Sequence, residues 1–223
     1  MLHVAALIQY LQGLSENNNR AWFVMNKPSY DILREEFTAL VAQVIERCAV
    51  FDARLRGLEA KQALFRINRD VRFAKDKRPY KTSFSAAISA DGKKSQGPMV
   101  YFHIDESGTL FMAAGCYRPE KDLLAAIRRH IAEHPQLLGK LLRNKHFIEL
   151  GGFATEDQLV RPPKGYDPQL PHIDTIRLKS FVVHAAIDLS KRAPKDLAKE
   201  IAANFEAMYP LVSWLRGALP KQG

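Results

Sequence analysis

The sequence has little cysteine, no long apolar run and no basic residue near its start. Two of its 223 residues are cysteines, Cys48 and Cys116, and they show neither a disulfide framework nor a zinc-ligand spacing. A secretory signal needs a basic region before its apolar core, but the first basic residue is Arg20. No apolar run approaches the roughly 18–20 residues that span a bilayer. We therefore expect a cytoplasmic protein with no membrane contact and two partly buried, reduced thiols.

The bulk composition is that of a globular protein. Hydrophobic residues make up 47% and charged residues 26% of the chain, which is enough apolar material for a core and argues against general disorder. Single domains commonly reach roughly 200–250 residues. We therefore expect residues 1–223 to form one domain.

Hydrophobic periodicity predicts helices at both ends of the chain and strands between them. The strands have apolar residues at every second position, and they are expected over 65–73, 83–90, 99–105, 109–115 and 178–187. The helices have apolar residues three and four apart, and they are expected over 2–12 (ended by Gly13), around Trp22 and Phe23, from Pro28 to Cys48, from Arg118 to Pro135, from Gln136 to Asn144, and from Pro194 to Arg216. A stiff, extended loop is expected over the four prolines of residues 161–171.

This order of elements predicts an α+β fold. Sequential strands joined by short turns favour a central, mainly antiparallel meander sheet flanked by N- and C-terminal helices. In the expected first strand, Phe65, Ile67 and Val71 form a buried face opposite the polar residues. Arg69 falls on that apolar face, so the pattern requires either a bulge or a buried charge with a partner.

Positive charge is concentrated in residues 61–81, which we call the basic segment. It has eight basic and two acidic residues, a net charge of +6 within a total of +9. Such a local field attracts anions, and arginine presents a planar fork to phosphate or carboxylate. The structural alternative is a solvated strand edge, but lysines rather than arginines would serve that purpose. Among the aromatic residues of this region, Phe65 and Phe73 are expected to be buried, which leaves Tyr80 as the ring available for stacking.

The basic segment also carries the longest stretch that resembles a known family. Phe65 to Phe73 reads FRINRDVRF, followed by Lys75-Asp76-Lys77 and Pro79-Tyr80-Lys81-Thr82. Further similar stretches are Asn17–Asn19 with Trp22-Phe23, Tyr117–Glu120, Arg161–Pro168 and Leu178–Phe181. Together they resemble the uncharacterised family catalogued as domain of unknown function 2461, over about Leu7 to Asp188.

The resemblance implies one folding unit and no known activity, cofactor or catalytic residue. This chain departs from the family at Ala74, where serine is common, and at Cys116-Tyr117, where tryptophan commonly replaces the tyrosine. If a hydroxyl at position 74 mattered for chemistry, this member would lack it.

The candidate site combines the basic segment with charged residues of the other similar stretches. The ligand-binding candidates are Arg66, Asn68, Arg69, Asp70, Arg72, Lys75, Lys77, Arg78, Tyr80, Lys81, Arg118, Lys164 and Lys179. Acid–base candidates are Asp70, Asp76 and His103, although a structural ion pair is the commoner role for such aspartates. His130 and His134 have the i, i+4 spacing of a chelating pair on a helix, but Pro135 and the polar residues around them favour a solvated helix end, so no metal site is expected. The loop over 161–171 is expected to bring Lys164 or Tyr166 to the rim of the basic segment.

Three functions are compatible with these residues. The first is binding of a phosphorylated or polyanionic ligand, of which nucleic acid is the commonest. The second is an enzyme acting on a phosphorylated small molecule, with Asp70 or Asp76 as the acid–base group or Mg²⁺ ligand. The third is an interaction module that docks an acidic protein partner.

Overall fold

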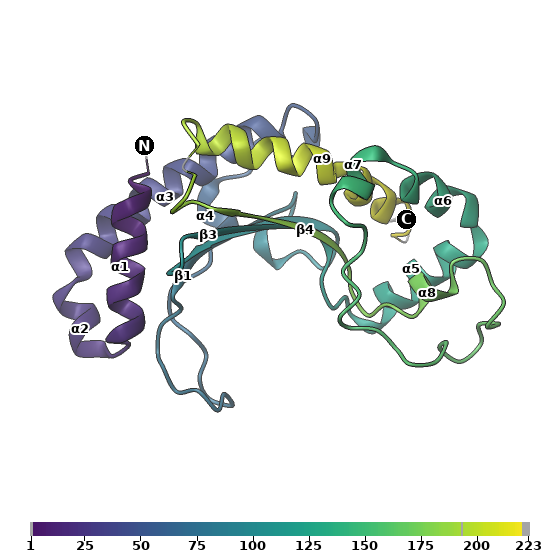
Figure 1. Ribbon diagram of the computed structural model, residues 1–223, viewed down its shortest axis with the longest axis horizontal. Helices are drawn as coiled ribbons and strands as arrows, with labels where there is room; N and C mark the ends of the chain where they lie inside the picture. The colour runs from purple at the N-terminus through teal and green to yellow at the C-terminus, as the bar shows by residue number, and fades with distance from the viewer. Residues whose placement is uncertain (1, 193, 220–223) are drawn as a thin grey trace. The chain divides into compact units, whose positions relative to one another are not determined.

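The computed structural model describes residues 2–192 and 194–219, with helices before, between and after the strands of one sheet (Figure 1). The chain divides into two compact units. Unit 1 comprises Met1–Lys93, Tyr101–Met112 and Ala186–Ala203, and unit 2 comprises Lys94–Val100, Ala113–Ala185 and Asn204–Gly223. Whether the two units fold as one domain of residues 1–223 stays a prediction.

The sheet confirms the predicted α+β class and antiparallel meander. Its four strands lie in sequence order, β1-β2-β3-β4. Their bounds are β1 Ser83–Ile88, β2 Met99–Asp105, β3 Thr109–Cys116 and β4 Phe181–Asp188. Strand β1 belongs to unit 1, whereas the other three strands have residues in both units.

Helices flank the sheet along the chain, as predicted. The longer helices are α1 Val4–Glu16, α2 Arg20–Met25, α3 Lys27–Cys48, α5 Lys121–Glu133, α6 Pro135–Leu142 and α9 Leu197–Gly217. Short helices, none of them predicted as separate elements, are α4 Ala60–Ala63, α7 Lys145–Glu149 and α8 Ile173–Ile176, and two 3₁₀ turns cover Ala53–Leu55 and Gly92–Lys94. No regular element lies between residues 161 and 171, where the prolines occur.

The core of unit 1 joins α3 to one face of the sheet. Phe37 of α3 is fully buried, and its ring centroid lies 5.5 Å from that of Phe84 in β1 and 5.6 Å from that of Phe102 in β2. Buried and half-buried residues alternate along β2 and the first part of β3. Because side chains of a strand alternate between faces, residues 101, 103 and 111 lie on the face opposite α3.

Helix α1 corrects the prediction that Gly13 ends the first helix, since it continues to Glu16. Gly13 instead allows a close approach: a Cβ at this position would lie 3.0 Å from Cζ2 of Trp22. The small residue therefore makes room for α2, and the helix ends at the polar turn that follows.

Unit 2 is built around α5 and the segment that leads into β4. Ile127 and Ile131 of α5 are fully buried. Arg128 of the same helix donates from Nε to the carbonyl oxygen of Ile176 at 2.8 Å and from Nη2 to that of Leu178 at 3.1 Å. These bonds fix the irregular chain around α8 by satisfying carbonyl groups that no strand pairs.

The predicted strand over residues 65–73 is wrong. This stretch has no strand; one isolated bridge joins Asn68 to Tyr80 within it, and another joins Leu64 to Ala86 just before it. Exposure still alternates from Arg66 to Arg72, so the periodicity correctly predicted which side chains face solvent. It fails at Phe73, which is 96% exposed rather than buried. A period-two pattern reports extended backbone with two different faces, and it does not guarantee a continuous ladder of hydrogen bonds.

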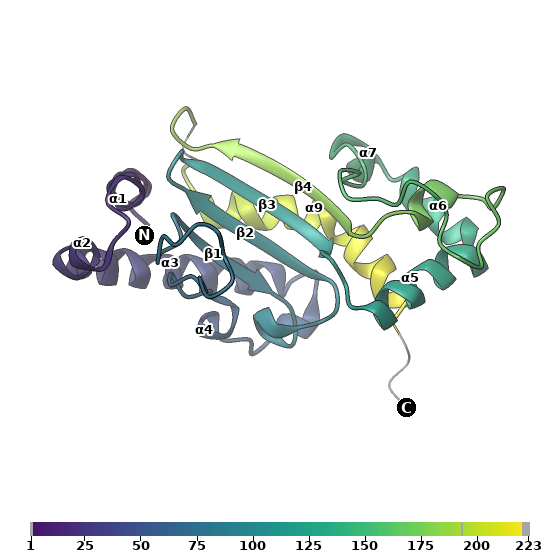
Figure 2. The same cartoon turned by 90° about the horizontal axis from the view of Figure 1, so that it is seen from below.

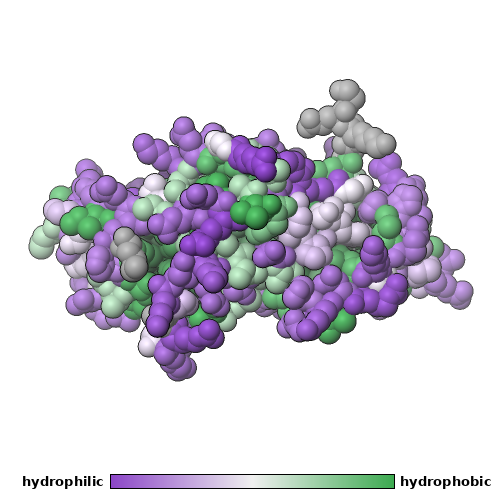
Figure 3. All heavy atoms as spheres, turned by 90° about the horizontal axis from the view of Figure 1, so that it is seen from above, coloured by the Kyte–Doolittle hydropathy of each residue, from purple (hydrophilic) through white to green (hydrophobic). Residues whose placement is uncertain are grey.

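The surface seen from above is hydrophilic over much of its area, with hydrophobic residues scattered between the polar ones (Figure 3). Within the described residues, none of the helices combines the length and the apolar character needed to cross a bilayer.

Candidate functional site: the basic segment

The basic segment leaves α4 and forms an irregular antiparallel ribbon beside β1. The backbone N–H of Lys81 donates to the carbonyl oxygen of Ile67 at 2.8 Å, and that of Arg69 donates to Pro79 at 2.8 Å. Beyond these bonds, residues 70–78 form the tip of the ribbon. The prolyl residue offers a carbonyl but no N–H, which is tolerated because this edge has no further strand to pair.

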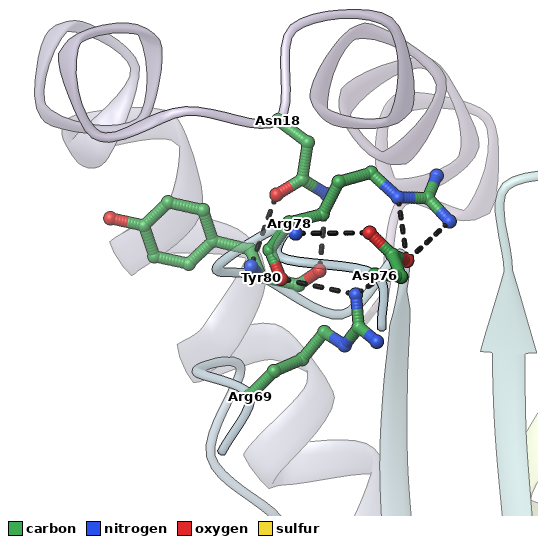
Figure 4. Close-up of polar contacts among 5 residues, drawn as sticks. All are labelled: Asn18, Arg69, Asp76, Arg78 and Tyr80. Atoms are coloured by element: carbon green, nitrogen blue, oxygen red, sulfur yellow. Dashed lines mark hydrogen bonds and ion pairs between the residues drawn. The ribbon is translucent and has the colours of Figure 1, made fainter. Parts of the chain in front are cut away.

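Asn18 fixes the base of this ribbon (Figure 4). Its side chain accepts a hydrogen bond from the Tyr80 N–H and donates one to the Tyr80 carbonyl oxygen, both at 3.0 Å. The Tyr80 ring is 7% exposed and stacks on Phe23 of α2 with ring centroids 4.2 Å apart. The prediction that Tyr80 is the ring available for stacking is therefore wrong, since α2 already covers it.

Asp76 organises the tip by binding two arginines (Figure 4). Its Oδ2 accepts from Nη1 of Arg69 at 2.7 Å and from Nε of Arg78 at 2.9 Å, while Oδ1 accepts from the Arg78 N–H at 3.0 Å. Hydrogen bonds from Arg78, and then from Arg69, hold the pKa of this carboxyl well below its usual range. Arg69 thus has the partner that its position on the apolar face required.

Asp70 forms a second, separate ion pair at the tip. Arg72 donates to it from Nε at 2.9 Å and from Nη2 at 2.7 Å. Hydrogen bonds from this guanidinium lower the pKa of the Asp70 carboxyl. Nearby, Nζ of Lys77 donates to the carbonyl oxygen of Val71 at 3.1 Å. Both aspartates therefore shape the ribbon, which is a poor setting for a general base because each is stabilised as an anion.

The remaining cations of the segment have no carboxylate partner. Within the described residues, no acidic group lies in ion-pair distance of five of the eight basic side chains: Lys61, Arg66, Lys75, Lys77 and Lys81. Burial, and secondarily the charge of Arg66, lower the pKa of Lys81. The segment therefore keeps a large uncompensated positive charge in addition to an ordered set of three arginines.

His103 lies on the half-buried face of β2, opposite α3, and not among the aspartates. Its ring stacks on that of Phe111 with centroids 5.2 Å apart, and burial lowers its pKa. Its Nδ1 is buried and has no hydrogen-bond partner among the residues that the structure describes. The acid–base candidates predicted from the sequence are thus placed in two different settings, with Asp70 and Asp76 at the ribbon tip and His103 on the sheet.

Two of the candidate residues in unit 2 converge on an aspartate that the sequence did not single out. Asp157 accepts from Nζ of Lys179 at 2.9 Å and from Nε of Arg118 at 3.2 Å. These contacts, led by the Lys179 hydrogen bond, lower the pKa of the Asp157 carboxyl. Lys164 is exposed and has no ion pair among the described residues. The prediction that its loop reaches the basic segment stays a prediction.

Sequence reasoning missed Asn18 and Asp157 for a common reason. Both act on residues distant in the chain, 62 positions away for Asn18 and 22 for the Asp157–Lys179 pair. The signal for Asn18 was its position in the Asn17–Asn19 stretch, which we used only as one of the stretches that carry the family resemblance. In the part of the chain that the structure describes, no group of three or more His, Cys, Asp or Glu side chains could hold a metal ion.

Together, the fold and this site define an α+β protein with an antiparallel meander sheet and an ordered cationic ribbon at its edge. The chain belongs to a family described as conserved hypothetical protein, DUF2461, whose profile matches residues 6–214. The resemblance noted from the FRINRDVRF stretch is thereby confirmed. No curated protein and no solved structure matches the chain.

Proposed function

We propose that the basic segment binds a phosphorylated polyanion, with nucleic acid as the commonest partner of that kind. The observation that carries this proposal is the charge balance of the basic segment: five of its eight cations have no carboxylate partner among the described residues, and two aspartates hold the other three, all arginines, in place. Such a surface attracts phosphates over a distance set by the Debye length, roughly 8–10 Å at moderate salt.

The ion pairs prepare the arginines for binding. The side chain of Arg72 is 76% exposed although both Nε and Nη2 contact Asp70. A guanidinium has five N–H donors, so Nη1 and the second hydrogen of Nη2 stay available to a phosphate. Holding the side chain in one conformation lowers the entropy that binding would otherwise cost.

The geometry favours an extended ligand over a small substrate. An enzyme acting on a phosphorylated small molecule needs a concave pocket in which its acid–base group and its cations converge. Here Asp70 and Asp76 are already saturated by arginines, and the ribbon tip is exposed. An acidic protein partner offers the same sign of charge, but the forked guanidinium groups of the four arginines suit the oxygens of phosphate at least as well.

The test is a fluorescence-anisotropy titration with single- and double-stranded oligonucleotides at several salt concentrations. We expect roughly four to six phosphate contacts, so log K should fall with log salt at a slope near −3 to −5. Arg66→Ala with Lys75→Ala should weaken binding to all sequences alike and reduce the slope by about two. These two positions are chosen because neither is in an ion pair, whereas removing Arg72 would leave Asp70 unpaired.

The matched control removes the same charge elsewhere in unit 1. Lys195 and Lys199 are exposed, so Lys195→Ala with Lys199→Ala should leave the affinity and the slope nearly unchanged. Absence of binding at low salt, or equal loss in both double variants, would contradict the proposal. Equal competition by poly-glutamate and by a polyphosphate would show that the segment recognises charge alone, as expected for an acidic protein partner.

A further inference from the structure

A row of aromatic rings crosses the sheet face opposite α3 and begins at the basic segment. Ring centroids are 6.2 Å apart for Phe65 and Tyr101, 5.6 Å for Tyr101 and His103, and 5.2 Å for His103 and Phe111. All four rings are half-buried and belong to unit 1. We call these four residues the aromatic row.

No helix of unit 1 covers this side of the sheet among the residues that the structure describes. Phe37, which packs α3 onto β1 and β2, contacts the opposite face. Seen from below, β1 lies in front of α3, and the ribbon of the basic segment passes before β1 (Figure 2). Sheets normally bury their aromatic residues against another layer, so half-buried rings on a side that no described helix of unit 1 covers can offer their exposed parts to a ligand.

Cations stand at the start of the row. Nζ of Lys81 lies 5.0 Å from the ring centroid of Phe65, within the range of a cation–π interaction. Arg66 is close enough for its charge to lower the pKa of Lys81, and in the described part of the chain it has no carboxylate partner within ion-pair distance. The two charges repel each other, and an anion placed between them would relieve that repulsion.

The row also contains a polar atom that the protein itself does not satisfy. Nδ1 of His103 is buried without a hydrogen-bond partner among the described residues. A buried polar group without a partner costs about 1–3 kcal/mol.

We propose that the aromatic row binds the bases of a single-stranded nucleic acid while Lys81, Arg66 and the basic segment bind its phosphates. This inference rests on the proposed function and adds the class of nucleic acid. Flat rings beside cations are what a single strand requires, because its unpaired bases stack on aromatic side chains and its backbone follows the positive charge. In a duplex the bases are already stacked on one another, so the row would contribute nothing to duplex binding.

The test compares three probes with equal numbers of phosphates: an oligo-dT strand, an abasic strand and a duplex. The intact protein should bind oligo-dT about tenfold more tightly than the abasic strand, because each base that stacks on an aromatic ring increases the affinity of the strand for the protein. Phe65→Leu with Tyr101→Leu should remove most of this difference and leave the affinity for the abasic strand unchanged. Tyr117→Leu, which removes an exposed ring outside the row, is the matched control and should behave as wild type.

A second measurement does not depend on the folding of any variant. Oligo-dT carrying 5-iodouracil, photocrosslinked to the wild-type protein and mapped by mass spectrometry, should label the aromatic row. Equal affinity for oligo-dT and the abasic strand, or crosslinks confined to other aromatic residues, would overturn this inference and leave the proposed function standing. If neither strand binds, the proposed function fails and this inference fails with it.

Discussion

The side-chain amide of Asn18 pairs with the main chain of Tyr80 as a neighbouring strand would. It accepts from the N–H and donates to the carbonyl oxygen of the same residue, both at 3.0 Å. This contact joins two of the stretches that resemble the family, Asn17–Asn19 and Pro79–Thr82. The polar turn before α2 forms part of the support of the basic segment.

Asn18→Ala should destabilise unit 1. The substitution leaves the Tyr80 N–H and carbonyl without partners, at a cost of about 1–3 kcal/mol. Chemical denaturation followed by circular dichroism measures this loss. The neighbouring Asn17→Ala is the control, since Asn17 makes one exposed bond to Gly13 and should change the free energy of unfolding by about 0.5 kcal/mol or less. Similar losses for both variants would show that the pairing with Tyr80 contributes little.

Asp76→Asn should loosen the tip of the ribbon without unfolding the protein. The variant weakens the bonds from both Arg69 and Arg78, so backbone amides of residues 70–78 should exchange faster with deuterium. Lys195→Ala, which removes an exposed charge outside the ribbon, should leave the exchange there unchanged. Slow exchange at the tip in Asp76→Asn would mean that the turn itself, and not the ion pairs, orders this region.

The fold was predictable to the extent that each element depends on its own residues. The strands 99–105 and 109–115 were correct because each alternates apolar and polar residues and ends at a turn. Residues 65–73 alternate in the same way, but their partner strand is irregular, and its geometry depends on Asn18 and on Asp76. Phe73 was expected to be buried because apolar side chains usually are, yet its surroundings at a ribbon tip offer nothing to cover it.

The candidate site was predictable in composition and not in connectivity. The sequence identified the arginines of the basic segment and the two aspartates among them, but it could not assign Asp70 to Arg72 or Asp76 to the pair Arg69 and Arg78. Such pairings depend on how the chain turns between residues 70 and 78. The aromatic row was beyond prediction for a further reason, because Phe65 and Tyr101 meet only when the ribbon lies beside β1.

Both thiols should react slowly with a disulfide reagent in the native protein. Cys48 is 1% exposed and Cys116 is 3% exposed, and burial raises the pKa of the Cys116 thiol to about 12 from an ordinary value of 9.0. Since only the thiolate reacts, the native rate at pH 8 should be roughly two orders of magnitude or more below the rate in denaturant.

Ionisation of the Cys116 thiol makes the stability of the protein fall at high pH. Its folded pKa is raised, so the contribution of the neutral Cys116 thiol to stability is complete below about pH 9 and is lost as the pH rises toward about 12. Cys116→Ala should therefore lose less stability than wild type over this interval. For the reactivity prediction above, rapid modification of the wild-type thiols by the disulfide reagent at pH 8 would show that the structure around a cysteine opens locally.

Lys81 should titrate below the ordinary lysine value of 10.5, since burial and the charge of Arg66 both lower its pKa. NMR observation of the side-chain Nζ groups measures this, and Arg66→Gln should raise the pKa part of the way back. Because the folded pKa is depressed, the stability linked to Lys81 is complete above pH 10.5 and falls as the pH falls through the folded pKa. A saturating abasic strand should also raise this pKa, since a phosphate favours the charged form.

A single methyl group should separate β3 from β4. Gly115 has φ +128°, and a Cβ there would lie 2.0 Å from the carbonyl oxygen of Phe181, a backbone atom that cannot move without breaking the strand pairing. Gly115→Ala should therefore cost several kcal/mol or prevent folding of unit 2. Gly57→Ala is the matched control, because Gly57 also has a positive φ, +82°, but a Cβ there meets nothing within 4 Å. That variant should lose only about 1–2 kcal/mol from backbone strain.

Thermal unfolding followed by circular dichroism compares the two variants, and hydrogen exchange of the β3 and β4 amides locates the region that Gly115→Ala destabilises. Equal melting temperatures would show that strain in φ, and not the contact with Phe181, is what the glycine at position 115 relieves.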